Sequence, residues 1–188
     1  MVKKVVASIG IGCFVGLGFL TLFFSSCEKD DICTKETPKT PLLFIEFYDI
    51  DNPTTPKAVN NLEVRAERFL DDTLHVPLKF NNVTFIKIPL DVTQNSTTYY
   101  FTINAGNQNP NLVNTDKLVF TYNRSDIYIS RACGFKTFFD FNVLQPIQIE
   151  EVGAEWTPPT APGFWVLSQL LINTQVQADD EAHLNLFF

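Results

Sequence analysis

The sequence predicts an all-β protein, built as a single antiparallel β-sandwich of the immunoglobulin-like or a related type. Three observations predict it: apolar and polar residues alternate in short segments, turn-forming residues separate these segments, and helical spacing is scarce. A chain of 188 residues suits one domain, and its hydrophobic fraction of 45% excludes a disordered protein. We expect about seven to nine short strands.

The first segment, residues 1–26, is predicted to be a lipoprotein signal peptide. Two lysines precede an uncharged apolar stretch over residues 5–24, and two serines stand before Cys27. A positive start, an apolar run and small residues at the exit are typical of secretory signals. Residues 24–27 resemble a bacterial lipobox, in which the cysteine thiol accepts diacylglycerol, with Phe24 in place of the usual leucine. The apolar run is also long enough to span a bilayer, so an uncleaved anchor is the alternative.

The residues that follow the cysteine predict the destination of the protein. Lys29, Asp30 and Asp31 lie just beyond Cys27. A lysine and two acidic residues in this place resemble the export signal of Bacteroidetes-type lipoproteins, which directs them through the outer membrane to the cell surface. A solvated charged tether is the alternative. We expect an outer-membrane lipoprotein exposed on the cell surface, with a periplasm-facing orientation as the alternative and the membrane as a partner through the lipid anchor.

The rest of the chain divides into a tether and one domain. Residues 34–41 are polar and hold two prolines, which is typical of a spacer. We therefore expect an acylated tether and spacer over residues 27–41 and the β-sandwich over residues 42–188.

Strands are expected throughout that domain, in the order of the chain. Residues 42–48 are almost continuously apolar, and residues 62–67 alternate strictly between apolar and charged, the period of a half-exposed strand. Residues 59–69 and 164–172 also have a spacing that a helix could use. Similar β-forming runs occupy residues 83–90, 98–103, 118–122, 127–131, 135–144, 164–176 and 183–188.

Loops and core residues follow from the same pattern. Asparagine and glycine at residues 104–107, and proline and glycine at residues 153–163, predict loops. The mature chain can bury roughly 70% of its surface, which is enough for one core. Four phenylalanines are expected to fill it: Phe135, Phe138, Phe139 and Phe141.

Cys33 and Cys133 are predicted to form a disulfide bond. Signal cleavage removes one of the four cysteines and acylation uses Cys27, which leaves these two. An exported protein meets no system that keeps thiols reduced, so an even pair favours a bridge. Two free buried thiols are the alternative. A metal site has little support, because the sequence has no C-x-x-C pair and only His75 and His183 as further ligands.

The net charge of the chain and the motifs that it lacks argue against several classes of function. The net charge of −7 becomes −9 once residues 1–26 and their two lysines are removed. An acidic protein is a poor partner for nucleic acid, which needs clustered lysine and arginine. The sequence contains no phosphate-binding loop, nucleophile elbow or paired-histidine zinc motif. We therefore expect no catalytic residues and no cofactor.

Two weaker features could bind a ligand. Trp156 and Trp165 flank a proline-rich stretch and could form a stacking platform for sugar rings, although a sandwich core also takes tryptophan routinely. Asp49, Asp51 and Asn52 place oxygen atoms at nearby positions, as calcium loops do, but without the rest of an EF-hand.

Five stretches of the chain share one resemblance. They are Cys27-x-x-Asp30-Asp31-Ile32-Cys33, Phe47-Tyr48-Asp49 with Asn52-Pro53, Ile88-Pro89-Leu90, Ser130-Arg131-Ala132-Cys133-Gly134-Phe135 and Glu181-Ala182-His183-Leu184-x-Leu186. Together they resemble an uncharacterised family of Bacteroidetes lipoproteins, a domain of unknown function. The resemblance implies the lipid anchor and the pairing of Cys33 with Cys133, and it implies no activity.

These observations favour a non-enzymatic, lipid-anchored module that binds an envelope protein or a glycan. A structural accessory subunit of an outer-membrane complex is the alternative. An envelope hydrolase is a third hypothesis, for which the sequence nominates no acid/base pair.

Overall fold

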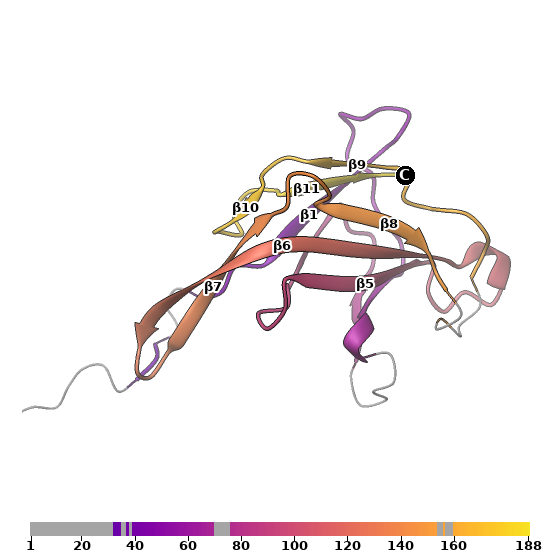
Figure 1. Ribbon diagram of the computed structural model, residues 1–188. Coiled ribbons are helices and arrows are strands. Elements are labelled where there is room, and N and C mark those ends of the chain that lie inside the picture. The colour runs from indigo at the N-terminus through magenta and orange to yellow at the C-terminus, as the bar shows by residue number, and fades with distance from the viewer. Residues whose placement is uncertain (1–31, 35–36, 38, 70–75, 154–155, 157–159) are drawn as a thin grey trace, which may run out of the picture. The chain divides into compact units, whose positions relative to one another are not determined.

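The computed structural model describes residues 32–34, 37, 39–69, 76–153, 156 and 160–188 (Figure 1). The predicted signal peptide, Cys27, Lys29, Asp30, Asp31 and His75 lie outside the described residues. No helix among those residues is long and apolar enough to cross a membrane. Contacts divide the described residues into two units. One runs up to Thr37 and includes Ile129–Gly134, and the other comprises Pro38–Tyr128 and Phe135–Phe188.

The larger unit contains two β-sheets, which confirms the predicted all-β class. The first sheet has four strands in the order β4 (Phe85–Ile88), β1 (Leu43–Tyr48), β11 (Leu184–Phe187) and β9 (Ser168–Leu171). β1 and β11 run parallel and the other two pairs are antiparallel. In β1 buried and half-buried residues alternate, because a strand turns successive side chains to opposite faces.

The second sheet is antiparallel and has seven strands. Its main order is β10 (Gln175–Val176), β7 (Gly134–Phe141), β6 (Asn114–Ser130), β5 (Ser96–Ile103), β2 (Leu62–Ala66) and β3 (Leu78–Phe80). β8 (Ile147–Glu151) pairs with β6 away from that path. Two short 3₁₀ helices, η2 (Glu67–Phe69) and η3 (Pro110–Leu112), complete the elements with regular structure among the described residues.

One hydrophobic core includes side chains from both sheets. Ile45 and Leu186 come from the four-stranded sheet, and Phe101, Phe120 and Phe139 come from the seven-stranded sheet. Each of these five side chains is buried. Burial of a large apolar side chain stabilises a fold by roughly 1.5–3 kcal/mol, so this core is the main stabilising element of the domain.

Two sequence expectations are corrected here. Residues 59–69 and 164–172 could have been helices by spacing, but they contain β2 and β9. In β2, Leu62 and Val64 are buried and Glu63 between them is not, so the period-2 pattern prevails over the helical one. The structure also joins the separate runs 118–122 and 127–131 into β6 and adds β3 and β8, which were not among the predicted strands.

The phenylalanine prediction is half right. Phe139 and Phe141 are buried in the core, whereas Phe138 is only half-buried and Phe135 is 65% exposed. Phe135 lies on the same side of β7 as Phe139 by strand alternation. It is exposed because the facing part of β6, from Asn123 onward, has no buried side chain.

Candidate functional site

The disulfide bond is present and lies within the smaller unit. Cys33 and Cys133 are joined with a Cα–Cα distance of 5.0 Å and a sequence separation of 100 residues. Cys133 lies in the turn between β6 and β7, where its backbone N–H donates to Ser130 Oγ at 3.1 Å. The turn ends at Gly134, whose φ of +69° is a backbone conformation that glycine adopts without strain. The predicted pairing is therefore confirmed.

Trp165 is a core residue. Only 6% of it is exposed, and its indole Nε1–H donates to the carbonyl oxygen of Phe101 at 2.9 Å. Because its ring packs inside the core, Trp165 cannot stack on a ligand. The prediction that it forms part of a sugar-binding platform is therefore wrong for this residue.

Asp116 fixes the segment that carries Trp165. One oxygen, Oδ2, accepts hydrogen bonds from the backbone N–H of Trp165 at 3.0 Å and of Val166 at 2.7 Å. The residue is 1% exposed, and its other oxygen, Oδ1, has no hydrogen-bond partner within the described part of the chain. Burial raises the pKa of Asp116 to about 6, although the two backbone N–H groups oppose this change. The sequence held no signal for this residue beyond its place in an alternating strand.

The candidate calcium loop is a turn held by its own contacts. Asp49 Oδ1 accepts the backbone N–H of Asp51 at 3.2 Å and lies 3.4 Å from the ammonium group of Lys57. Asn52 Oδ1 accepts the hydroxyl of Thr54 at 3.2 Å. Two of the oxygens that would bind calcium, Asp49 Oδ1 and Asn52 Oδ1, are thus engaged by protein donors, one of them a cation. No group of three or more His, Cys, Asp or Glu residues in the described ranges could hold a metal ion.

His183 directly precedes β11 and connects it to β1, its neighbour in the four-stranded sheet. It is buried at 2% exposure, its backbone N–H donates to the Phe44 carbonyl at 2.9 Å, and Nδ1 accepts the Phe44 N–H at 3.1 Å. Burial lowers the pKa of His183, which favours the neutral ring that this acceptor role requires.

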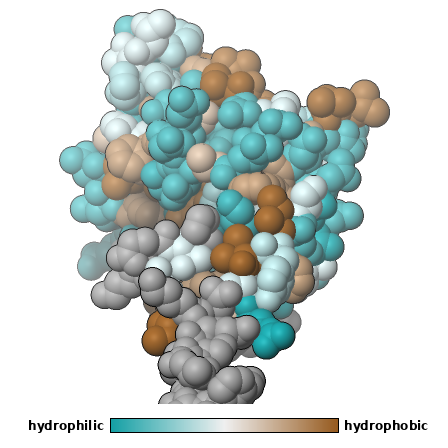
Figure 2. Space-filling view, turned by 90° about the vertical axis from the view of Figure 1, so that its left-hand side faces the viewer, coloured by the Kyte–Doolittle hydropathy of each residue, from teal (hydrophilic) through white to brown (hydrophobic). Residues whose placement is uncertain are grey.

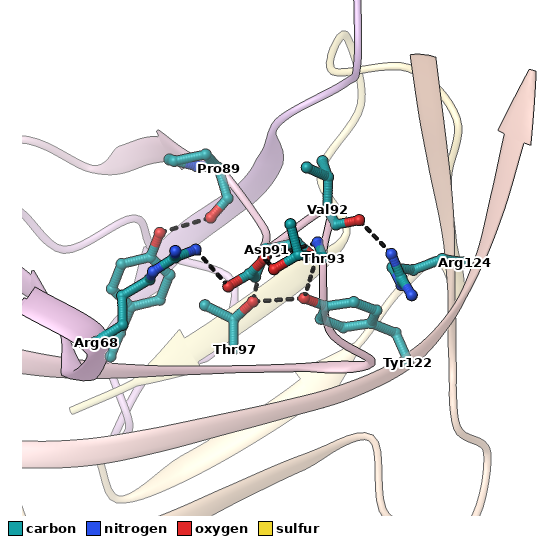
Figure 3. A network of polar contacts seen from close by, with 9 residues as sticks. Arg68, Pro89, Asp91, Val92, Thr93, Thr97, Tyr122 and Arg124 are labelled. Atoms are coloured by element: carbon teal, nitrogen blue, oxygen red, sulfur yellow. Dashed lines mark hydrogen bonds and ion pairs between the residues drawn. The ribbon is translucent and has the colours of Figure 1, made fainter. Parts of the chain in front are cut away.

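A cavity of about 290 Å³ lies beside the loop between β4 and β5. Figure 3 shows the polar contacts around it, which centre on Asp91. The Asp91 carboxylate accepts the N–H of Thr93 at 2.7 Å, the hydroxyl of Thr93 at 2.6 Å and an N–H of Arg68 at 2.8 Å. Burial would raise the pKa of Asp91, but these contacts outweigh it and lower the pKa below its ordinary value.

The hydroxyl groups of Thr97 and Tyr122 hold the backbone of the same loop. Thr97 Oγ1 accepts the N–H of Asp91 at 2.8 Å and lies 2.5 Å from the hydroxyl of Tyr122, which donates to the Asp91 carbonyl at 2.9 Å (Figure 3). Arg124 donates to the carbonyl oxygen of Val92 on the other side of the loop. Because the polar groups of this cavity bind one another, we interpret the network as a structural clamp.

Replacing Asp91 by asparagine is expected to lower the free energy of unfolding by about 1–2 kcal/mol at neutral pH, because the charge-assisted bonds from Arg68 and Thr93 are lost. The folded pKa is lowered, so this contribution exists above the ordinary pKa and disappears as the pH falls through the folded one. Urea unfolding at several pH values measures it. An equal loss at all pH values would contradict the charge argument.

Trp156 lies against the outer face of the seven-stranded sheet. Its ring stacks on Tyr100 of β5 with centroids 4.8 Å apart and planes 13° from parallel. Ion pairs surround the stack: Glu63 with Arg65 at 3.0 Å, and Lys117 with Glu67 at 3.4 Å. The indole Nε1 is buried and has no hydrogen-bond partner among the residues that the structure describes.

One pocket borders this tryptophan, and a second pocket adjoins the first. One, of about 270 Å³, is lined by residues that include Thr102, Asn107 and Trp156, and the other, of about 300 Å³, by residues that include Lys79 and Asn81. Both are lined by Glu63, Ala105 and Gly106, so together they form one groove, which we call the Trp156 groove. The turn at its centre has positive φ at Asn104 and Gly106, as the predicted loop over residues 104–107 requires.

The Trp156 groove is the best candidate for a ligand site. It joins an aromatic ring, amide side chains and one carboxylate in a concave surface, which is the usual make-up of small-ligand sites. From the sequence only Trp156 was predictable, since the groove depends on the register between Glu63 and Thr102 of neighbouring strands.

Comparison with known proteins gives a family but no activity. Residues 61–188 match a family described as a family of unknown function, DUF6452. No curated protein and no solved structure matches the chain. The matched region covers the strands from β2 to β11 and includes every residue that lines the Trp156 groove.

Proposed function

We propose that this chain, which belongs to the DUF6452 family of unknown function, is a lipid-anchored, non-enzymatic binding module of the bacterial envelope. The observation that carries the binding function is the Trp156 groove, which offers an aromatic ring and polar groups to a ligand. We propose a glycan as that ligand.

The domain that holds the groove is proposed to be a single β-sandwich over residues 42–188. The shared core supports this, because side chains of both sheets, such as Phe47 of β1 and Phe101 of β5, belong to one cluster. Two sheets that bury their apolar faces against each other are the defining feature of a sandwich.

The anchor is proposed to be a diacylglycerol group on Cys27, in a lipoprotein of the Bacteroidetes type. The apolar signal before the cysteine and the sequence Lys29-Asp30-Asp31 after it support outer-membrane localisation and exposure on the cell surface. Two or more acyl chains hold a protein stably on a membrane, since each buried CH₂ contributes roughly 0.8 kcal/mol.

A sugar suits the chemistry of the groove. Aromatic rings offer an apolar face to the C–H groups of a sugar ring, while amide and carboxylate groups bind its hydroxyls. The stack on Tyr100 fixes the plane of the Trp156 indole, which reduces the entropy lost when a ligand binds.

A binding role fits this groove better than hydrolysis. Cleavage of a glycosidic bond generally needs two carboxyl groups on opposite sides of the bond. Among the described residues that line the groove, Glu63 is the one carboxylate, and it already pairs with Arg65 at 3.0 Å and Lys79 at 3.7 Å.

Replacing Trp156 by alanine is expected to weaken glycan binding tenfold or more, because losing an aromatic stacking contact costs at least about 1.4 kcal/mol. A glycan array followed by calorimetry on the best ligand measures this. Trp156→Phe should retain part of the affinity. Phe85→Ala is the matched control, since Phe85 is an exposed aromatic residue on the other sheet. Binding that survives in Trp156→Ala, or a wild-type protein that binds no glycan, would contradict the proposal.

An accessory subunit of an outer-membrane complex is the second candidate, and strand β9 favours it. β9 lies at the end of the four-stranded sheet, and Leu167, Leu170 and Ile172 are each more than half exposed. Residues 156–178 contain no charged side chain. Uncharged apolar edges are suited to pairing with another chain. Co-purification of an integral membrane protein that is lost in Leu170→Lys would support this role.

A further inference from the structure

We propose that the end of the β6–β7 hairpin rests on the lipid surface, with the rings of Tyr128 and Phe135 in the interfacial layer. This inference rests on the proposed lipid anchor at Cys27. It adds a second, non-covalent membrane contact and thereby an orientation for the domain.

The disulfide bond ties this end of the hairpin to the anchor. Five residues lie between Cys27 and Cys33, and a fully extended chain over these six steps spans at most about 22 Å. The disulfide adds a Cα–Cα distance of 5.0 Å to Cys133. The Cα atom of Cys133 therefore lies within roughly 27 Å of the acylated residue, whatever path residues 28–32 take. Without the bond the chain between them would run through more than 100 residues.

The hairpin end near Cys133 exposes large apolar side chains. Phe135 is 65% exposed, Tyr128 is 55% exposed and Ile127 is 42% exposed. The rings of Tyr128 and Phe135 contact each other edge to face with centroids 5.4 Å apart. Phe135 follows Cys133 by two residues, so the chain itself keeps it near the anchored cysteine. Figure 2 looks at the molecule from the side toward which β6 and β7 extend in Figure 1, and separate apolar groups are visible there on a mainly polar surface.

The hairpin end contributes no buried side chain to the hydrophobic core. From Asn123 to Lys136 no residue of the chain is buried, whereas Tyr122 before it and Thr137 after it are. A strand pair built only for stability gains nothing from extending beyond the core. Aromatic side chains at an exposed end suit an interface that is apolar on one side and wet on the other, which is where tyrosine gathers in membrane proteins.

The charge of the hairpin end also favours lipid. Next to the two rings the hairpin end holds Arg131 and Lys136 against one acid, Asp126, in a chain whose net charge is −7, while Arg124 bonds to Val92 of the β4–β5 loop. Basic side chains are attracted to the phosphate groups of lipid head groups, by about 1 kcal/mol each near an anionic surface. A protein partner could also bind the rings of Tyr128 and Phe135. The short covalent link to Cys27 favours the membrane, because it keeps this end of the hairpin close to the lipid surface.

Quenching by brominated lipid tests the contact. The full-length acylated protein is reconstituted into phosphatidylcholine vesicles, with or without bromine on the acyl chains, as Phe135→Trp and as the matched control Leu144→Trp. Leu144 is 87% exposed and lies in the turn at the opposite end of β7. We expect brominated lipid to quench the added fluorescence of Phe135→Trp and to leave that of Leu144→Trp unchanged.

The outcomes separate this inference from the anchor on which it rests. Mass spectrometry of the vesicle-bound protein first shows whether Cys27 is acylated. If it is, and Phe135→Trp is not quenched or is quenched no more than Leu144→Trp, the hairpin contact is wrong while the anchor stands. A photo-crosslink from position 135 to an envelope protein, without quenching, would assign the surface to a protein partner and also overturn the inference. If Cys27 carries no lipid, the anchor and the inference fail together.

Removing the disulfide bond gives a second test, with the same tryptophan probe at position 135. In the double variant Cys33→Ser/Cys133→Ser with Phe135→Trp, the lipid anchor remains but no longer holds the hairpin. Quenching should then fall while the protein stays bound to the vesicles. Undiminished quenching in a variant shown by circular dichroism to be folded would contradict the role given to the disulfide.

Discussion

Replacing Asp116 by alanine is expected to lower the free energy of unfolding by about 2–5 kcal/mol. The substitution leaves the buried N–H groups of Trp165 and Val166 without their acceptor. Denaturant unfolding measures the change. Asp140→Ala is the control, since Asp140 is an exposed residue of β7 and should change stability by less than about 0.5 kcal/mol. Similar effects of the two substitutions would contradict the role given to Asp116.

Asp116→Asn keeps the size of the side chain and removes its ability to ionise, so it measures how the charge of Asp116 affects stability. The pKa of the folded protein, about 6, lies above the ordinary value of 3.8, so the native state binds the proton more tightly than the unfolded chain does. The wild type is therefore most stabilised by this group below the ordinary pKa, and it loses roughly 3 kcal/mol of that stability as the pH rises through the folded pKa. Asparagine cannot ionise, so Asp116→Asn should gain on the wild type by about this amount between pH 4 and 7. A difference that does not vary with pH would contradict the raised pKa.

Removing the disulfide bond is expected to lower the free energy of unfolding by about 4–5 kcal/mol, because the bond closes a loop of 100 residues in the unfolded chain. Thermal unfolding of Cys33→Ser/Cys133→Ser measures the loss. The wild type should show the same lower Tm after reduction, while the double variant should not respond to reductant. A wild-type Tm that reductant leaves unchanged would contradict this expectation.

Most of the fold was predictable because alternation is a local property. β1 buries every second residue and β2 begins in the same way, while β5 and β11 bury further residues besides the alternating ones, and the positions of all four follow from apolar spacing. β3 was not predicted because it has three residues, none of them buried, and β8 was not predicted because only Ile147 of its five residues is buried. The exposure of Phe135 was also not predictable, since it depends on where the core ends along the hairpin.

The candidate site was less predictable than the fold. The disulfide followed from the compartment and the number of cysteines, which need no three-dimensional information. The two tryptophans look alike in the sequence, but Trp165 enters the core and Trp156 stacks on Tyr100 at the outer face. The partners that decide this, Asp116 and Tyr100, are 49 and 56 residues away in the chain. Only strand register brings such residues together.

Mass spectrometry of the N-terminal peptide tests the central claim, that this family member is an anchored envelope module. The full-length chain is expressed in a bacterium that processes lipoproteins, and the protein is purified from its membranes. We predict a peptide that begins at Cys27 and carries diacylglycerol on the thiol, and we expect Cys27→Ala to lose both the modification and the membrane fraction. A peptide that retains residues 1–26, or one that begins elsewhere with an unmodified Cys27, would contradict the account.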